Sequence, residues 1–85
     1  MKTVWKFEIP NAENDVRLPA GSTLRHFAVQ NGVPFVWAEV DTDAGVIERR
    51  TLVIVGTGQP VPDGAHYIDT CLEGPFVWHL YEMKH

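Results

Sequence analysis

Cysteine is almost absent from this 85-residue chain, because Cys71 is the only one. A single cysteine cannot form a disulfide within the chain, so the fold depends on its apolar core, with or without partner subunits. The chain also lacks any apolar run near the roughly 18 residues that a membrane span needs, and its first residues lack the apolar stretch of a secretory signal. We therefore expect a cytoplasmic protein that does not bind membranes.

Basic residues are scarce. The chain has 7 lysines and arginines against 11 aspartates and glutamates, and its formal net charge is −4. Proteins that bind duplex nucleic acid draw much of their affinity from lysine and arginine side chains that neutralise phosphates. The charge balance therefore argues against duplex nucleic acid as the main partner.

Convincing helical periodicity is missing from every stretch of the chain, whereas short runs with strand character recur. Apolar residues make up 45% of the sequence, which is ordinary for a protein that folds. The pattern predicts one all-β domain over residues 1–85, built as a small antiparallel β-sandwich or barrel of about six to seven strands. The predicted strands are residues 3–9, 15–18, 24–30, 33–41, 49–55, 65–72 and 76–83.

The clearest local signal is a β-hairpin that turns at Asn31-Gly32. This dipeptide readily adopts the two positive φ angles of a type I′ turn, and β-prone runs flank it on both sides. Residues 15–18 predict a short edge strand because Pro19 and Gly21 follow them, and residues 49–55 predict a central strand. Three glycines and two prolines within residues 56–64 predict an exposed loop.

One segment allows a second interpretation, in which the fold contains one short helix. Ser22 and Thr23 could cap such a helix, and Leu24, Phe27 and Ala28 follow at helical spacing. Residues 22–30 are therefore either a strand or a short helix.

Catalytic and metal-binding patterns are not recognisable. The histidines at positions 26, 66, 79 and 85 have none of the spacings of a metal site, and no second cysteine is available to complete one. Cys71 lies within a predicted strand, which favours a buried structural thiol over a nucleophile. We therefore predict no enzyme activity, no cofactor and no metal.

Apolar residues exceed what the core of so small a domain requires. Residues 33–40 are apolar on both faces of the predicted strand, which indicates a partner chain, a ligand surface or a second layer. Trp5, Trp37 and Trp78 are expected to anchor the core, and one that proved exposed would mark a binding site.

A loop, cations and aromatic rings together make a site for an anion or a nucleotide. On this reasoning we predict a ligand- or partner-binding surface. Its residues are Arg49, Arg50, Thr57, Trp37 and His79.

Three stretches, residues 1–10, 29–38 and 56–60, resemble a family of short uncharacterised proteins encoded by bacteriophages and prophages. The resemblance runs along nearly the whole chain, although residues 41–50 and 60–66 differ in content from the family. It implies a phage or prophage origin and an accessory role inside the host cell. The family provides no activity and no catalytic residues to transfer.

Together these observations predict a non-enzymatic accessory binding protein, a host-defence antagonist that forms a homo-oligomer in the host cytoplasm. Its partner would be a host protein or a small anionic, nucleotide-like ligand. The alternative is a structural or assembly accessory of the virion, which would share the β-rich fold and the self-association without needing a pocket.

Overall fold

A computed structural model of the protein describes residues 1–84, and His85 lies outside the described residues. Seven β-strands follow one another, and the described residues contain no helix. The all-β prediction is therefore confirmed. The strands are β1 (Lys2–Glu8), β2 (Glu13–Pro19), β3 (Thr23–Gln30), β4 (Val33–Asp41), β5 (Ile47–Gly56), β6 (Ala65–Glu73) and β7 (Phe76–Met83).

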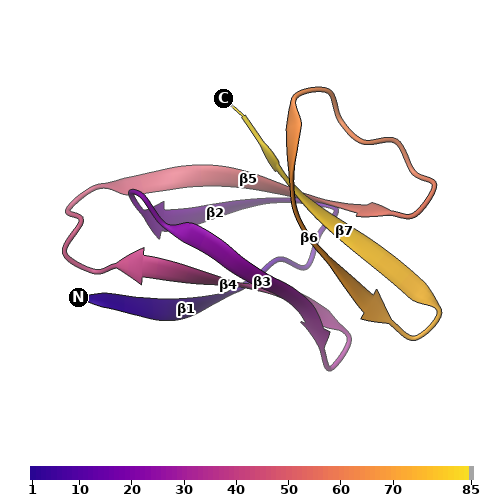
Figure 1. Ribbon diagram of the computed structural model, residues 1–85, viewed down its shortest axis with the longest axis horizontal. Helices are drawn as coiled ribbons and strands as arrows, with labels where there is room; N and C mark the ends of the chain where they lie inside the picture. The colour runs from indigo at the N-terminus through magenta and orange to yellow at the C-terminus, as the bar shows by residue number, and fades with distance from the viewer. Residues whose placement is uncertain (85) are drawn as a thin grey trace.

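The strands form two antiparallel sheets, consistent with a small β-sandwich (Figure 1). One sheet has the order β1-β4-β3, and the other has the order β2-β5-β7-β6. β5 lies between β2 and β7, which confirms its predicted central place, and β2 is the edge strand that the sequence predicted. The β5–β6 connection arches away from the sheets as an exposed loop, as the density of glycine and proline predicted.

The β3–β4 hairpin turns at Asn31 and Gly32, whose φ angles are 51° and 77°. The predicted type of turn is therefore confirmed. β3 covers the segment for which the sequence also allowed a helix, and the helix interpretation is wrong. Its i, i+3 apolar spacing comes from a β-bulge: the register shifts between Leu24 and His26, so Leu24 and Phe27 both face the core three residues apart.

The core lies between the two sheets and consists of aliphatic residues and one phenylalanine. Its fully buried members come from both sheets and from the β1–β2 connection, and they include Ile9, Leu18, Phe27, Val36, Ala38, Leu52 and Leu80, each 0% exposed. None of the three tryptophans is buried, so the expectation that they anchor the core was wrong for Trp5 and Trp37. Trp37 points outward because its neighbours Val36 and Ala38 point inward, and Trp5 lies on an edge strand and is 40% exposed.

A carboxylate connects the two sheets where β3 lies beside β6. Asp69 accepts a hydrogen bond from the backbone N–H of Phe27 over 2.9 Å. A second bulge, between Tyr67 and Asp69, interrupts the β6–β7 register at this position. The two sheet edges cannot pair directly at the bulges, so the Asp69 side chain satisfies a backbone donor that would otherwise lack a partner.

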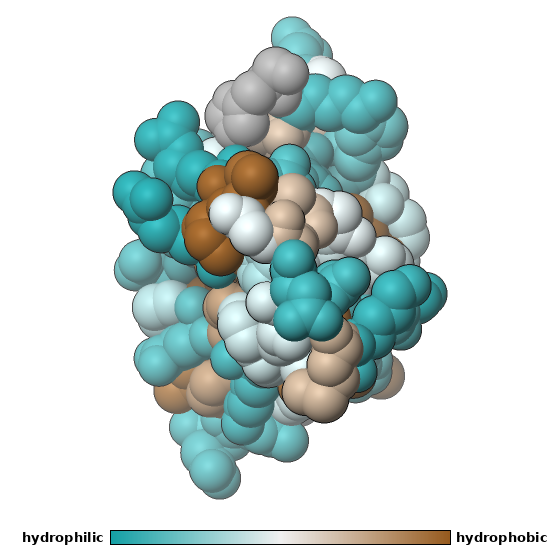
Figure 2. Space-filling model, turned by 90° about the vertical axis from the view of Figure 1, so that its left-hand side faces the viewer, coloured by the Kyte–Doolittle hydropathy of each residue, from teal (hydrophilic) through white to brown (hydrophobic). Residues whose placement is uncertain are grey.

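Figure 2 views the molecule from the left-hand side of Figure 1, and hydrophilic side chains cover most of this face. A small hydrophobic patch interrupts them. Val46 and Ile47, in and after the β4–β5 connection, are two of the exposed large apolar residues of the chain. No helix among residues 1–84 is long and apolar enough to cross a membrane.

Candidate functional site

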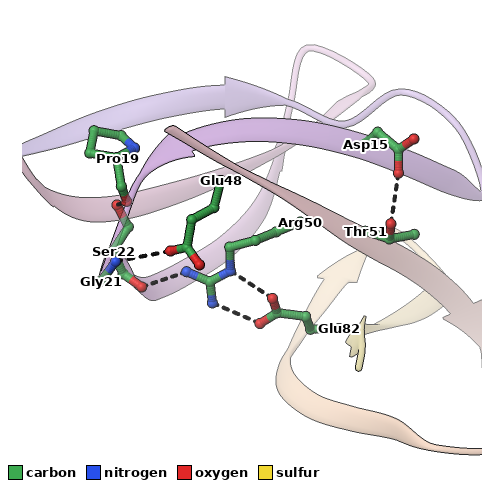
Figure 3. A network of polar contacts seen from close by, with 8 residues as sticks. All are labelled: Asp15, Pro19, Gly21, Ser22, Glu48, Arg50, Thr51 and Glu82. Atoms are coloured by element: carbon green, nitrogen blue, oxygen red, sulfur yellow. Dashed lines mark hydrogen bonds and ion pairs between the residues drawn. The ribbon is translucent and has the colours of Figure 1, made fainter. Parts of the chain in front are cut away.

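Arg50 of β5 faces the interior and is held by Glu82 of β7 (Figure 3). Its Nε and Nη2 atoms donate to the two Glu82 carboxylate oxygens over 2.6 and 2.7 Å. The third donor, Nη1, reaches the backbone carbonyl of Ser22 over 2.5 Å. One guanidinium therefore ties together β5, β7 and the turn before β3.

The Arg50–Glu82 pair is mostly removed from water, because the two side chains are only 19% and 18% exposed. The hydrogen bonds and charge of Glu82 raise the pKa of Arg50 despite the opposing effect of burial. A bidentate pair of this kind uses the fork of N–H donors that an arginine would otherwise present to a phosphate. Arg50 is thus a structural residue in this geometry.

A hollow of about 390 Å³ opens beside this pair, and we name it the Arg49 hollow. The basic residues in its wall are Arg49, Arg50, His66 and Lys84, and the acidic ones are Glu48 and Glu82. Glu48 accepts a hydrogen bond from the backbone N–H of Gly21, and Glu82 is engaged by Arg50. Both carboxylates of the wall therefore already have donors.

Arg49 and Lys84 are the available cations of the Arg49 hollow. The Arg49 side chain is 60% exposed, and its only ion pair among the described residues is a 4.0 Å contact with Asp15. Within residues 1–84, no ion pair holds Lys84. The hollow therefore has an excess of positive charge over its two acidic residues although the whole chain is acidic.

Thr57 and His79, which the sequence predicted to share a site, are in direct contact. Thr57 Oγ1 lies 2.9 Å from His79 Nε2, and Thr70 Oγ1 lies 3.0 Å from His79 Nδ1. The Tyr67 hydroxyl continues the chain, 2.7 Å from Thr70 Oγ1. Both ring nitrogens of His79 thus have partners, which makes this a connected polar network between the β5–β6 loop, β6 and β7.

Trp37 lies elsewhere, on the outward face of the β1-β4-β3 sheet. Its ring is 5.6 Å from the His26 ring and 6.1 Å from the Phe35 ring, measured between centroids. The Lys6 ammonium lies 3.9 Å from the Phe35 centroid and 5.4 Å from the Trp37 centroid. A lysine already occupies the aromatic surface that was expected to complete the predicted site.

The structure thus places the five predicted residues in three locations. Arg49 and Arg50 line one hollow, Thr57 and His79 belong to the polar network, and Trp37 lies on the other sheet. Sequence reasoning missed His66 and Lys84. In the pairing of β6 with β7, His66 lies opposite Glu82, the residue that holds Arg50. The spacing of these residues along the chain does not indicate that His66 lies near Arg50.

Comparison with known proteins identifies one family, and its match covers residues 1–85. The family is described as a domain of unknown function, DUF7352. The chain belongs to this family. No curated protein and no solved structure matches it. The function of this DUF7352 domain therefore has to be argued from its own residues.

Histidine, cysteine and acidic side chains in residues 1–84 of the DUF7352 domain form no group of three that could hold a metal ion. Cys71 is partly buried on β6. Burial, followed by the charges of Asp69 and Glu73, raises the pKa of the Cys71 thiol. A raised pKa leaves less thiolate at neutral pH, and the thiolate is the reactive form.

We expect iodoacetamide at pH 7.5 to modify Cys71 of the folded DUF7352 domain about tenfold more slowly than Cys71 of the domain unfolded in urea. Mass spectrometry of samples quenched over time measures both rates. Glutathione in the same solutions controls for the effect of urea on the reagent. Equal rates in the folded and unfolded protein would contradict the shielded thiol.

Proposed function

We propose that this protein is a non-enzymatic binding protein that holds a small anionic ligand in the Arg49 hollow. The carrying observation is that the hollow offers two cations, Arg49 and Lys84, while Arg50 neutralises Glu82 and leaves Glu48 as the one opposing charge. A phosphate group suits such a site, because arginine and lysine donate charge-assisted hydrogen bonds to phosphate oxygens.

The fixed Arg50–Glu82 pair supports this proposal by giving the hollow a rigid wall. The guanidinium is held at three points, so it does not need to be ordered when a ligand arrives. Rigid surroundings reduce the entropy cost of binding, since fewer side chains lose freedom. In this proposal Arg49 and Lys84 contact the ligand, and Arg50 positions the strand that carries Arg49.

The biological setting is part of the same proposal. The resemblance to phage and prophage proteins supports an accessory role in the cytoplasm of an infected bacterium. A small protein that sequesters a nucleotide-like ligand could antagonise a host defence that uses such a molecule as a signal. A host protein with an acidic or phosphorylated surface is the other partner that the hollow could accept.

Self-association is proposed alongside ligand binding, and it also favours a second candidate function in virion assembly. β1 pairs only with β4 among the described strands, so its other edge is free, and it exposes Val4 and Trp5. β2 is also an edge strand, but Glu13, Asp15 and Arg17 line it with charge, which discourages pairing. The β1 edge is therefore where copies of the chain would join.

Native mass spectrometry with ATP as the probe tests the ligand and the assembly together. We expect a closed oligomer that gains the mass of ATP and does not gain the mass of adenosine, which lacks phosphate. Arg49→Gln should weaken ATP binding at least about tenfold, because a hydrogen bond to a charged group contributes about 1.5–3 kcal/mol. The matched control is Arg25→Gln, which alters an exposed arginine of the other sheet.

The outcomes separate the candidates. Equal weakening of ATP binding by Arg49→Gln and Arg25→Gln would overturn the Arg49 hollow as the site. Open-ended polymers that do not bind ATP would favour virion assembly. A monomer at all concentrations would exclude the proposed self-association.

A further inference from the structure

Two hollows lie at the other end of β7, around Trp78. Trp78 lines these two hollows, of about 350 and 430 Å³, so both hollows share its side chain as part of their wall. A strand rises about 3.3 Å per residue, so this end of β7 is roughly 20 Å from the Arg49 hollow. We name the pair of hollows the Trp78 groove.

An exposed aromatic pair forms part of the Trp78 groove. The rings of Phe76 and Trp78 are nearly parallel, with an interplanar angle of 21° and 5.6 Å between their centroids. They lie on the same side of β7 because side chains alternate along a strand. Phe76 is 56% exposed, so much of its ring is free for a ligand.

A close approach of the β5 backbone positions Trp78. Gly56 is its cross-strand partner, and a Cβ atom at Gly56 would lie only 3.3 Å from a carbon of the indole ring. Glycine therefore allows the ring to lie against the backbone at the start of the β5–β6 loop. Gly56 thus has a packing reason to be small.

The charge of the Trp78 groove is negative. Glu73 is the one charged residue among those that line the two hollows, and its Oε1 atom accepts the indole N–H of Trp78 over 3.0 Å. The carboxylate keeps acceptor capacity beyond this single bond. The faces of aromatic rings attract cations, and a nearby carboxylate adds to that attraction. The remaining lining includes Pro10, Pro34 and Pro75, which are apolar.

We propose that the Trp78 groove docks a basic, extended segment of a partner protein, with an arginine side chain stacked on Phe76 and paired with Glu73. Charge complementarity selects this occupant, because both the groove and the whole chain are acidic. Arginine fits better than lysine, since its planar guanidinium both stacks on a ring and forks onto a carboxylate. This second surface makes the protein bivalent and does not depend on the Arg49 hollow.

The test follows the three tryptophan indole N–H signals by NMR during titration with an acetylated, amidated Gly-Arg-Gly-Arg-Gly peptide. Trp78→Phe assigns the signal of Trp78. We expect that signal to shift and saturate, while a peptide with citrulline in place of arginine causes no saturable shift. Citrulline has nearly the same shape as arginine without its charge.

Two variants locate the contact. Glu73→Gln and Phe76→Ala should each weaken arginine-peptide binding about tenfold. Both should fold, since glutamine still accepts the indole N–H and Phe76 is largely exposed. Glu13→Gln, which removes an exposed carboxylate from β2, is the matched control and should leave binding unchanged.

The proposal is overturned if the citrulline peptide binds as well as the arginine peptide, or if Glu73→Gln and Glu13→Gln have the same effect. Shifts confined to the signals of Trp5 or Trp37 would place the peptide elsewhere and would also overturn it. Arg49→Gln should abolish neither the shift nor its saturation, so failure of the ATP experiment and failure of this one are distinguishable.

Discussion

Replacing Phe27 by alanine is expected to lower the free energy of unfolding by about 4 kcal/mol. Phe27 is fully buried and is the largest of the fully buried side chains. The substitution removes its transfer free energy and leaves a cavity that rigid neighbouring strands cannot close. Phe27 lies beside the position where Asp69 connects the two sheets, so the cavity would open next to that contact.

Urea denaturation followed by circular dichroism measures the loss. Phe76→Ala is the matched control, because it deletes the same atoms from a largely exposed ring and should cost about 1 kcal/mol or less. Phe27→Leu should recover most of the stability, because leucine refills much of the volume. Equal losses for Phe27→Ala and Phe76→Ala would contradict the position of the core.

Arg50→Met is expected to lower the free energy of unfolding by about 3 kcal/mol. Methionine keeps the apolar stem but removes the charge, so the Glu82 carboxylate and the Ser22 carbonyl lose their donors in a region with little water. A carboxylate left without its partner in such a place is costly. Most of the lost stability therefore comes from the unpaired Glu82 carboxylate, and much less comes from the loss of the favourable Arg50–Glu82 attraction.

A double variant separates these two contributions. Arg50→Met combined with Glu82→Leu should recover at least half of the loss, because no uncompensated charge then remains. Arg49→Met is the matched single control and should change stability by no more than about 0.5 kcal/mol, since Arg49 is mostly exposed. Comparable losses for Arg49→Met and Arg50→Met would show that the Arg50–Glu82 pair is not structural.

The two arginines illustrate where sequence reasoning stopped. Adjacent residues of a strand point to opposite faces, so we expect Arg49 and Arg50 to differ in exposure and in their availability to a ligand. Which one is free depends on Glu82, which is 32 residues further along the chain and reaches Arg50 only through the pairing of β5 with β7. Spacing along the chain does not report such a contact.

The tryptophans show the same limit. Composition favoured them as core anchors, but alternation along β4 turns Val36 and Ala38 inward and leaves Trp37 outside. The run is apolar on both faces, so the sequence could not distinguish the inner face from the outer one. The packing of the other sheet determines which face of β4 is the inner one, because only one face of β4 can pack against the core.

Local physical chemistry was sufficient to predict the positions of the strands, the Asn31-Gly32 turn and the exposed β5–β6 loop from the sequence. Alternation, turn residues and chain breakers act over a few neighbouring residues, so the order of amino acids already contains their effect. Tertiary structure alone decided the bulge in β3, the engagement of Arg50 by Glu82 and the separation of Arg49, Thr57 and Trp37. These features depend on strand register and on which sheet faces meet, and both arise only when distant segments pack together.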